Sequence, residues 1–206
     1  MPSGQKLWEG VYAMREMINM IVVLTVLTTF SGGLLAAVKS KTQVRIENQV
    51  LKFQKAPAIK GIFPETTNDP LAERFNVKTE NTELQIFPAK LSDGAKAIAF
   101  ETSGTGFGGS LGLMVGINLD TDTIVGVRVT THSETPGIGS RAKDNLSFVS
   151  QFSGKGLDTV FAVKADGGAI DAMSGATVTS KAVSLAATQA KEIYQKLKPE
   201  IVKQME

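Results

Sequence analysis

The chain has 206 residues, of which 42% are hydrophobic, and its formal net charge is +2. This length holds one sizeable domain with residues left over for an anchor, and so small a charge gives no electrostatic basis for binding nucleic acid. The sequence contains no cysteine, so disulfides, thiolate ligands for iron–sulfur clusters and cysteine nucleophiles are excluded, and any redox chemistry needs a bound organic cofactor.

The most apolar stretch is residues 17–38, which include no charged residue. As a helix at about 1.5 Å per residue it would span roughly 30 Å, enough to cross the hydrocarbon core of a bilayer. The alternatives are a buried core helix and a cleaved signal peptide, whose apolar region is shorter, about 7–15 residues, after a short basic start. Here Trp8, Tyr12 and Arg15 precede a longer run. The sequence therefore favours an uncleaved, single-pass membrane helix after an N-terminal segment of residues 1–16.

The basic residues on either side of this stretch bear on its orientation. Lys39, Lys41 and Arg45 follow it, whereas Lys6, Arg15 and the amino terminus precede it. By the positive-inside rule this distribution mildly favours a cytoplasmic domain after the helix. Long domains are translocated largely regardless of so small a bias, so the flanking charges do not decide the side.

Residues 39–82 are predicted to be a helical connector followed by a linker. Residues 39–55 mix apolar and charged side chains in a helical pattern, whereas prolines interrupt residues 56–70. The remainder, residues 83–206, is predicted to be one domain that opens with an antiparallel meander. Its strands are expected at residues 83–87, 96–101, 111–118 and 123–130, with a hairpin turn at residues 119–122.

Helices are expected at residues 139–152 and 177–197, with a further strand at residues 159–164 between them. The second helix has an apolar stripe that is expected to pack on the sheet. The stripe consists of Val178, Ala182, Leu185, Ala186, Ala190, Ile193 and Leu197. The predicted fold class is α+β, an antiparallel sheet with packed helices behind one N-terminal transmembrane helix.

The start of the second helix carries a run of small and hydroxylated residues. The run reads Ser174-Gly175-Ala176-Thr177-Val178-Thr179-Ser180. A helix start offers unpaired backbone N–H groups and the positive end of the helix dipole, which together favour a phosphate. Taken alone, the same run also fits an ordinary Ser or Thr N-cap after a glycine turn.

Two glycine-containing loops precede this run. In the loop Glu134-Thr135-Pro136-Gly137-Ile138-Gly139, Pro136 and Gly137 fit the centre of a type II turn, and Ile138 suits contact with a flat ring. An ordinary connecting turn is the alternative. Residues 104–109 lack the spacing and following helix of a dinucleotide fingerprint, so a hairpin bend with Phe107 packed on its neighbours is expected there.

Together these segments resemble the FMN-binding domain shared by the G subunit of the Rnf electron transport complex and the C subunit of the sodium-translocating NADH:quinone reductase. The resemblance rests on Asp171 with the run at residues 174–180, on the loop at residues 134–139, on the glycines at residues 106–109, and on their order behind one membrane helix. It covers residues 83–197 closely and residues 1–82 in layout only.

The resemblance implies that FMN is bound covalently, through its phosphate, to the hydroxyl of Thr177. A dedicated flavin transferase that uses FAD and magnesium would install it, with Asp171 helping the transferase to orient the acceptor. Around the phosphate the implied contacts are Ser174, Gly175, Ala176, Thr179, Ser180 and Lys181. Against the isoalloxazine ring they are Glu134, Thr135, Pro136, Gly137 and Ile138. Neither a catalytic residue nor a metal site of the chain's own is expected.

The resemblance further implies an electron relay in an ion-translocating ferredoxin:NAD+ oxidoreductase complex, with catalysis belonging to the complex. The implied partners are other membrane subunits, the transferase during maturation and the lipid bilayer of the inner membrane. The flavin domain would face the periplasm and residues 1–16 the cytoplasm, against the mild charge bias. Two alternatives stay open: the C subunit of the quinone reductase, and a non-redox, membrane-anchored binding or scaffold protein in which Thr177 is only a helix cap.

Overall fold

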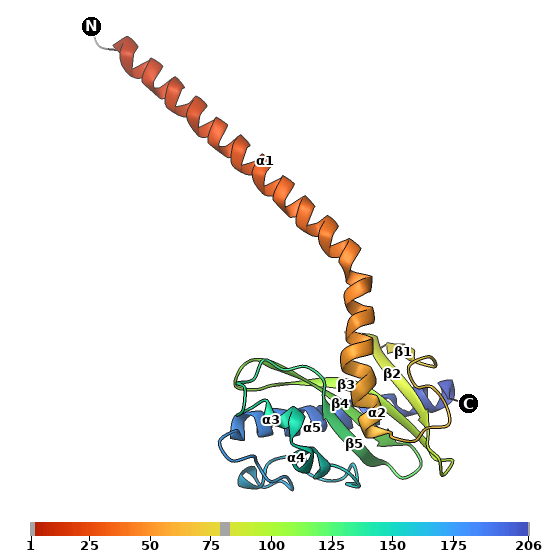
Figure 1. The fold of residues 1–206 in the computed structure, drawn as a ribbon. Helices are drawn as coiled ribbons and strands as arrows, with labels where there is room; N and C mark the ends of the chain where they lie inside the picture. Colours follow the sequence, from red (N-terminus) through yellow and green to blue (C-terminus); the bar gives the residue numbers. More distant parts are fainter. Residues whose placement is uncertain (1–2, 79–82, 206) are drawn as a thin grey trace. The chain divides into compact units, whose positions relative to one another are not determined.

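The computed structural model describes residues 3–78 and 83–205 (Figure 1). The outer ends of the predicted N-terminal segment and flavin domain, and residues 79–82 of the predicted linker, lie outside the described residues. The chain divides into two units, Met1–Gln49 and Val50–Glu206.

The described part of the first unit lies within helix α1, Ser3–Val50, which extends beyond the predicted membrane helix at both ends. The side chains of residues 17–38 are all exposed, and the helix is long and apolar enough to cross a membrane. Two hydroxyls of the apolar stretch are satisfied within the helix: Thr25 and Thr28 each donate to the carbonyl oxygen four residues earlier, at 2.8 Å. Such bonding is what a hydroxyl needs in hydrocarbon, where water is absent.

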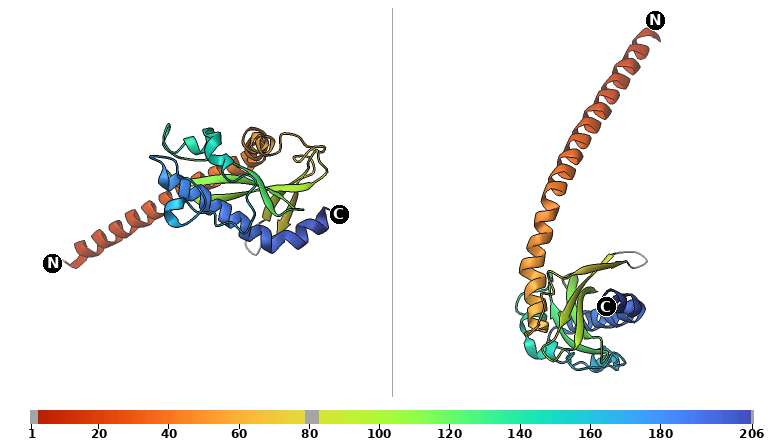
Figure 2. Two further views of the ribbon diagram at one scale, coloured as in Figure 1. Left: turned by 90° about the horizontal axis from the view of Figure 1, so that it is seen from below. Right: turned by 90° about the vertical axis from the view of Figure 1, so that its right-hand side faces the viewer.

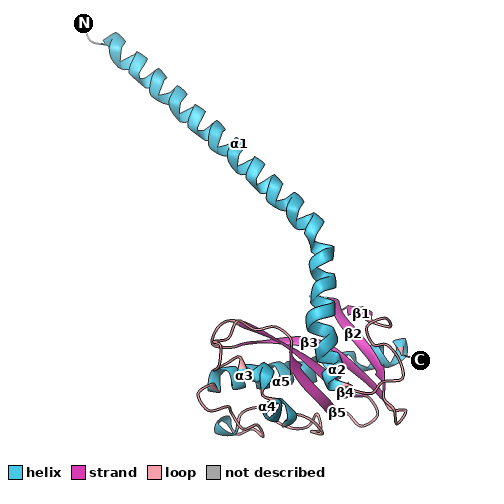
Figure 3. Ribbon diagram, in the orientation of Figure 1, coloured by secondary structure: helices cyan, strands magenta, loops and turns pink. Residues whose placement is uncertain are grey.

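The second unit is built on a five-stranded antiparallel sheet with the strand order β1-β2-β3-β4-β5 (Figure 3). The strands are β1 Phe75–Lys78, β2 Glu83–Lys90, β3 Lys96–Thr105, β4 Ser110–Asn118 and β5 Thr123–Val129. The predicted α+β class and the meander are confirmed. Strand β1 is an addition, since the sequence predicts a linker there. Its alternation of apolar and polar residues spans only four positions, with Val77 alone fully buried, which is the shortest run that indicates a strand.

Helix α5, Thr177–Gln204, covers one face of the sheet (Figure 2). The helix is confirmed, but its buried side differs from the predicted stripe, because Val178 and Leu185 are 49% and 51% exposed. The side that packs on the sheet is Ala182, Val183, Ala186, Ala187, Ala190 and Tyr194. Small residues dominate this contact, and they let the helix main chain approach the strands closely.

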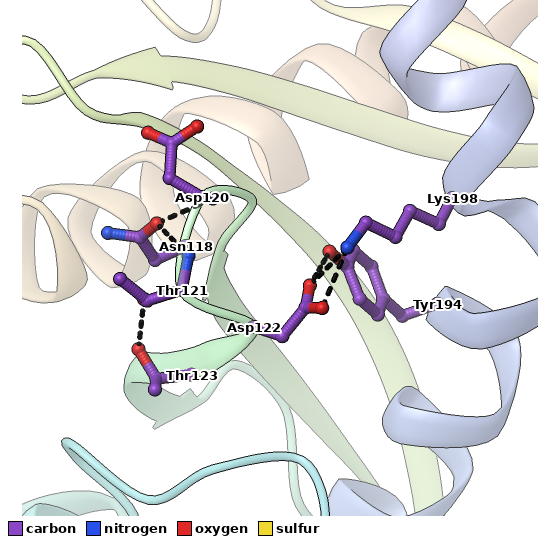
Figure 4. Close-up of polar contacts among 7 residues, drawn as sticks. All are labelled: Asn118, Asp120, Thr121, Asp122, Thr123, Tyr194 and Lys198. Carbon is purple, nitrogen blue, oxygen red and sulfur yellow. Dashed lines mark hydrogen bonds and ion pairs between the residues drawn. The ribbon is translucent and has the colours of Figure 1, made fainter.

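The far half of helix α5 is tied to the hairpin between β4 and β5 (Figure 4). Asp122, in the predicted hairpin turn, has a positive φ of 51°. Its carboxylate accepts a hydrogen bond from the Tyr194 hydroxyl and pairs with Lys198 at 2.7 Å. The hydrogen bond from Lys198, followed by that from Tyr194, holds the pKa of the Asp122 carboxyl below its ordinary value. Burial, and then the hydrogen bond to Asp122, raise the pKa of the Tyr194 hydroxyl.

Helix α2, Ala56–Ile62, packs on the opposite face of the sheet and follows a π-helical segment η1, Leu51–Lys55. The sequence predicts an irregular linker here, yet residues 58, 59, 62 and 63 are buried. Pro57 falls in the first turn, where a helix tolerates proline. Gly116 of β4 makes the necessary room, because a Cβ atom there would lie 2.4 Å from Cγ2 of Ile62.

Two further predictions between β5 and α5 need correction. The predicted helix at residues 139–152 is two short helices, α3 Arg141–Asp144 and α4 Leu146–Ser150. Asn145 separates them with an extended backbone, and its Oδ1 accepts from the amide of Ser147 at 3.0 Å, which starts the second helix. The predicted strand at residues 159–164, all of which are described, is a single bridge between Val163 and Ile170 followed by the short helix η2, Lys164–Asp166.

Candidate functional site

Three segments that are far apart in the sequence meet beside the start of helix α5 and enclose a cavity of about 440 Å³. One follows β3, one follows β5, and the third is the first turn of the helix itself. The residues that line the cavity are Phe107, Glu134, Thr135, Ile138, Gly139, Gly175, Ala176, Thr177, Val178 and Thr179. The wall therefore joins both predicted motifs, and Phe107, Gly139 and Val178 add to the predicted set.

The helix start leaves its amide groups open to the cavity. Ala176 is the N-cap residue and makes no side-chain capping bond, and the first turn has no acidic residue. Thr177 is the exposed first residue of the helix rather than its cap. The first N–H groups of a helix have no partner within the helix, so the amides of this turn are suited to an anion.

Ser180 and Lys181, predicted as phosphate contacts, are engaged elsewhere. The Ser180 hydroxyl is buried, donates to the carbonyl oxygen of Ala176 at 2.9 Å and accepts from the amide of Met173 at 3.0 Å. The Lys181 ammonium pairs with Asp166 at 2.8 Å. Both side chains therefore stabilise the segment under the helix start, outside the cavity wall. Ser174 likewise lies outside the wall, in the turn that precedes Gly175.

The loop after β5 forms the turn that its sequence predicts. Gly137 has a φ of 74°, and the amide of Ile138 donates to the carbonyl oxygen of Thr135 at 3.2 Å. Pro136 and Gly137 shape this turn without lining the cavity. As a result Ile138, which is 49% exposed, stands in the cavity wall.

Glu134 connects the three segments that form the cavity wall. Its side chain is buried, and its carboxylate accepts hydrogen bonds from the amide of Gly108 at 3.1 Å and from the hydroxyl of Thr179 at 2.7 Å. Its own amide donates to Nδ1 of His132 at 3.3 Å. The sequence marks Glu134 as part of a loop, but gives no sign that Thr179 is its partner.

Phe107 differs from its predicted role as a packed side chain in a hairpin bend, because it is 77% exposed. The glycines beside it explain this. A Cβ atom at Gly108 would lie 2.1 Å from the carbonyl oxygen of Ser133, so only glycine lets the two loops touch. The loop closes through its backbone, and the phenyl ring is left in the cavity wall.

Arg141 is a residue that the sequence patterns missed. Its Nε donates to the carbonyl oxygen of Ile138 at 3.1 Å, and its guanidinium also donates to the carbonyl oxygen of Ser174. One side chain thus connects the turn after β5 to the turn before α5. No local motif marks this role, because both acceptors are main-chain atoms.

The arrangement fits a flat aromatic ring attached to a phosphate. Phe107, Ile138 and Val178 offer exposed apolar surface in the wall, while the first turn of α5 offers amide donors. Cavities that hold small organic ligands are typically about 300–1,000 Å³ and mostly apolar, with a few polar groups that fix orientation. The residues present are therefore suited to FMN.

Comparisons with known proteins agree with this geometry. The family known as the FMN-binding domain matches residues 106–192 of this chain, a range that includes every residue of the cavity wall. The G subunit of the ion-translocating oxidoreductase complex of Escherichia coli O157:H7 is 34% identical over 194 residues, which cover 89% of this chain and 93% of that protein. Its counterpart in Cronobacter sakazakii is 32% identical over 190 residues, which cover 87% of this chain and 91% of that protein.

Solved structures with a similar chain include NqrC of Shewanella oneidensis, with 28% identity, a TM-score of 0.48, and coverage of 71% of this chain and 73% of that one. The C subunit of the Na(+)-translocating NADH-quinone reductase of Parabacteroides distasonis has 27% identity and a TM-score of 0.47. The match covers 55% of this chain and 62% of that one.

Proposed function

The chain belongs to the family formed by the G subunits of ion-translocating oxidoreductase complexes. From that premise we propose that it is a membrane-anchored flavoprotein that carries FMN covalently on Thr177. The bound FMN would relay electrons between other subunits of such a complex. The observation that carries the proposal is the position of Thr177, exposed at an uncapped helix start beside a cavity suited to a flat ring.

Attachment requires an external enzyme. A threonine hydroxyl is a weak nucleophile without an activating base, so a flavin transferase with FAD and magnesium supplies the base and the metal. The bond between Oγ1 of Thr177 and the FMN phosphorus forms while the bond between the two phosphates of FAD breaks. AMP leaves, and the hydroxyl proton passes to the base of the transferase. The exposure of Thr177 supports access for such an enzyme.

When bound, FMN supplies the electron-accepting chemistry, and the chain supplies its position. The amides of Thr177, Val178 and Thr179 are available to hold the phosphate at the positive end of helix α5. Ile138 and Phe107 offer apolar contact to the ring and exclude water from it. A link through the phosphate keeps the cofactor from being lost and leaves the ring free to react.

The partners follow from the family. Relatives named as G subunits of ion-translocating oxidoreductase complexes support a place beside other subunits of an Rnf-type complex, rather than in the quinone reductase. Helix α1 spans the inner membrane once, with residues 1–16 in the cytoplasm and the flavin domain on the periplasmic side. A covalent link is of most use on that side, where no free flavin replaces a lost cofactor.

The experiment that tests this function is co-expression of the full chain with a flavin transferase. Intact-mass and peptide analysis should find one FMN, less one water, on the peptide that contains Thr177. A known acceptor of the same transferase, expressed in parallel, controls for its activity. A colourless chain of unmodified mass beside a modified control would refute the proposal and favour a binding or scaffold role.

A further inference from the structure

Glu134 is the only ionisable residue in the cavity wall within the part of the chain that the structure describes. Its side chain is 6% exposed, and buried carboxylates ordinarily pair with a cation or a metal. The ion pairs found among the side chains of residues 14–78 and 83–205 use other acidic residues, namely Glu101, Asp122, Asp166 and Asp171. Among the described side chains, Glu134 thus has hydrogen bonds but no cationic partner.

The carboxylate is held in one place. Oε1 accepts from the amide of Gly108 at 3.1 Å, and Oε2 accepts from the hydroxyl of Thr179 at 2.7 Å. Glycines close around it as well. A Cβ atom at Gly106 would lie 2.1 Å from Oε1, and one at Gly139 would lie 2.3 Å from Oε2. The two glycines therefore let the loops lie directly against the carboxylate, which a side chain at either position would displace.

The position of this carboxylate explains how its charge is tolerated. Thr179 is the third residue of helix α5, so the carboxylate lies at the first turn, where the partial positive charge of the helix is concentrated. The first turn contains no acidic residue of its own that would compete. Stabilised in this way, a negative charge remains fixed in the wall of the cavity.

On the basis of the proposed FMN site, we infer that Glu134 is a positioning residue that both joins the three cavity segments and lowers the reduction potential of the bound flavin. Two electrons taken up with one proton give an anionic reduced ring, and with two protons a neutral one. A fixed negative charge in a site of low polarity opposes the anionic form. Glu134 therefore shifts the equilibrium toward oxidised flavin and makes the reduced flavin a stronger donor.

The test replaces the charge and keeps the contacts. In Glu134→Gln the amide oxygen can accept from Gly108 while the NH₂ group donates to the Thr179 hydroxyl, so the joint between the loops is retained. The full chain is flavinylated with its transferase, solubilised in detergent and titrated with dithionite against a reference dye. The equilibrium constant for reduction is expected to rise at least tenfold, about 30 mV for a two-electron couple.

The matched control is Glu192→Gln, which removes an exposed carboxylate from the same helix. It should leave the potential unchanged. A Glu134→Gln protein whose potential equals that of this control would overturn the inference. The inference would also be overturned if Thr179→Val raised the reduction potential as much as Glu134→Gln does. Thr179→Val keeps the carboxylate and removes one of its contacts, so the shift would then follow from geometry rather than from charge.

A second variant protects the test against misfolding of Glu134→Gln. Thr135→Lys adds a cation at an exposed position in the cavity wall, next to the carboxylate, and should also raise the potential. An unchanged potential there would overturn the role of Glu134. These outcomes are distinct from failure of the proposed function, which would be seen as a wild-type chain that takes up no FMN, and that outcome would overturn both.

Discussion

Gly104 of strand β3 lies directly against the main chain of Ala182 in helix α5, where a Cβ atom would stand 2.2 Å from the carbonyl oxygen of Ala182 and 2.9 Å from its carbonyl carbon. Nearby, the Thr102 hydroxyl donates to the carbonyl oxygen of Ala186 at 2.9 Å. These contacts hold the first half of the helix close to the sheet. The place of Thr177 is thus fixed by a strand far earlier in the chain.

Gly104→Ala should therefore destabilise the protein by about 1–3 kcal/mol, the usual cost of overpacking a filled core. The obstructing atoms are backbone, so no change of rotamer relieves the clash. Urea unfolding of the solubilised protein, followed by circular dichroism, measures the effect. Gly126→Ala is the control, because its Cβ would meet Cγ2 of Ile62 at an ordinary 3.7 Å. Equal stabilities of the two variants would show that close approach at Gly104 is unimportant.

Thr177→Ala should give a folded protein without covalent flavin. The change removes an exposed hydroxyl and a methyl group at a helix start where Ala176, not Thr177, is the N-cap, so stability should stay within about 0.5 kcal/mol of wild type. Thr177→Ser retains the hydroxyl and should keep some modification. Flavin fluorescence on a denaturing gel measures attachment. FMN that still migrates with the denatured Ala variant would mean that another residue carries it.

Much of this fold follows from local sequence, and the remainder depends on partners distant in the chain. The meander is predictable because short β-like runs alternate with turn residues, and the start of helix α5 is predictable from its small, hydroxylated residues. The buried side of helix α5 cannot be predicted in this way, because it depends on the close approach of the helix to Gly104 in strand β3. Helix α2 is hidden for a similar reason, since Gly116 makes the room for Ile62.

The candidate site divides in the same way. Its two motifs can be found in the sequence, because phosphate binding and turn geometry each require particular residue types at fixed spacing. The contacts between the two motifs cannot be found in the sequence. Glu134 meets Thr179, and Arg141 reaches the carbonyl oxygen of Ser174, only because helix α5 packs on the sheet with its first turn beside the loop that follows β5.

The pair formed by Asp122 and Lys198 should make stability depend on acid pH. The pKa of Asp122 is lowered in the folded protein, so the contribution is present above the unfolded value of about 3.9 and is lost as pH falls through the folded pKa. The carboxylate is half exposed, so the contribution should be about 1 kcal/mol or less at neutral pH. Asp122→Asn, which tolerates the positive φ, should lose that amount at pH 7.

Unfolding of wild type and Asp122→Asn at pH 7 and at pH 3 measures this linkage. The difference between the two proteins should shrink at the lower pH. Tyr194→Phe serves as the control, since it removes the hydrogen bond to Asp122 but keeps the ion pair with Lys198, and should cost about 1 kcal/mol. A difference between wild type and Asp122→Asn that is the same at both pH values would contradict a role for the carboxylate charge.

Gly137→Val should damage the flavin site without breaking the covalent bond. Gly137 has a φ of 74°, which a β-branched residue adopts only with strain, so the turn that presents Ile138 should shift. Covalent FMN is expected at reduced yield, with an altered absorption spectrum or potential. Gly137→Asn is the control, because asparagine visits this conformation more readily. A wild-type spectrum and potential in fully flavinylated Gly137→Val would separate this loop from the flavin.

The last prediction concerns the side of the membrane on which the flavin domain lies. Lys196 is exposed on helix α5, and the chain has no cysteine, so Lys196→Cys provides a single reactive thiol. If the domain is periplasmic, a membrane-impermeant thiol reagent should label this variant in spheroplasts, despite the basic Lys39, Lys41 and Arg45 that follow the apolar segment. Lys6→Cys, on the other side of that segment, should be labelled only after the membrane is ruptured. The reverse pattern would place the domain in the cytoplasm, in agreement with the flanking charges, and would remove the argument that the covalent link compensates for a compartment without free flavin.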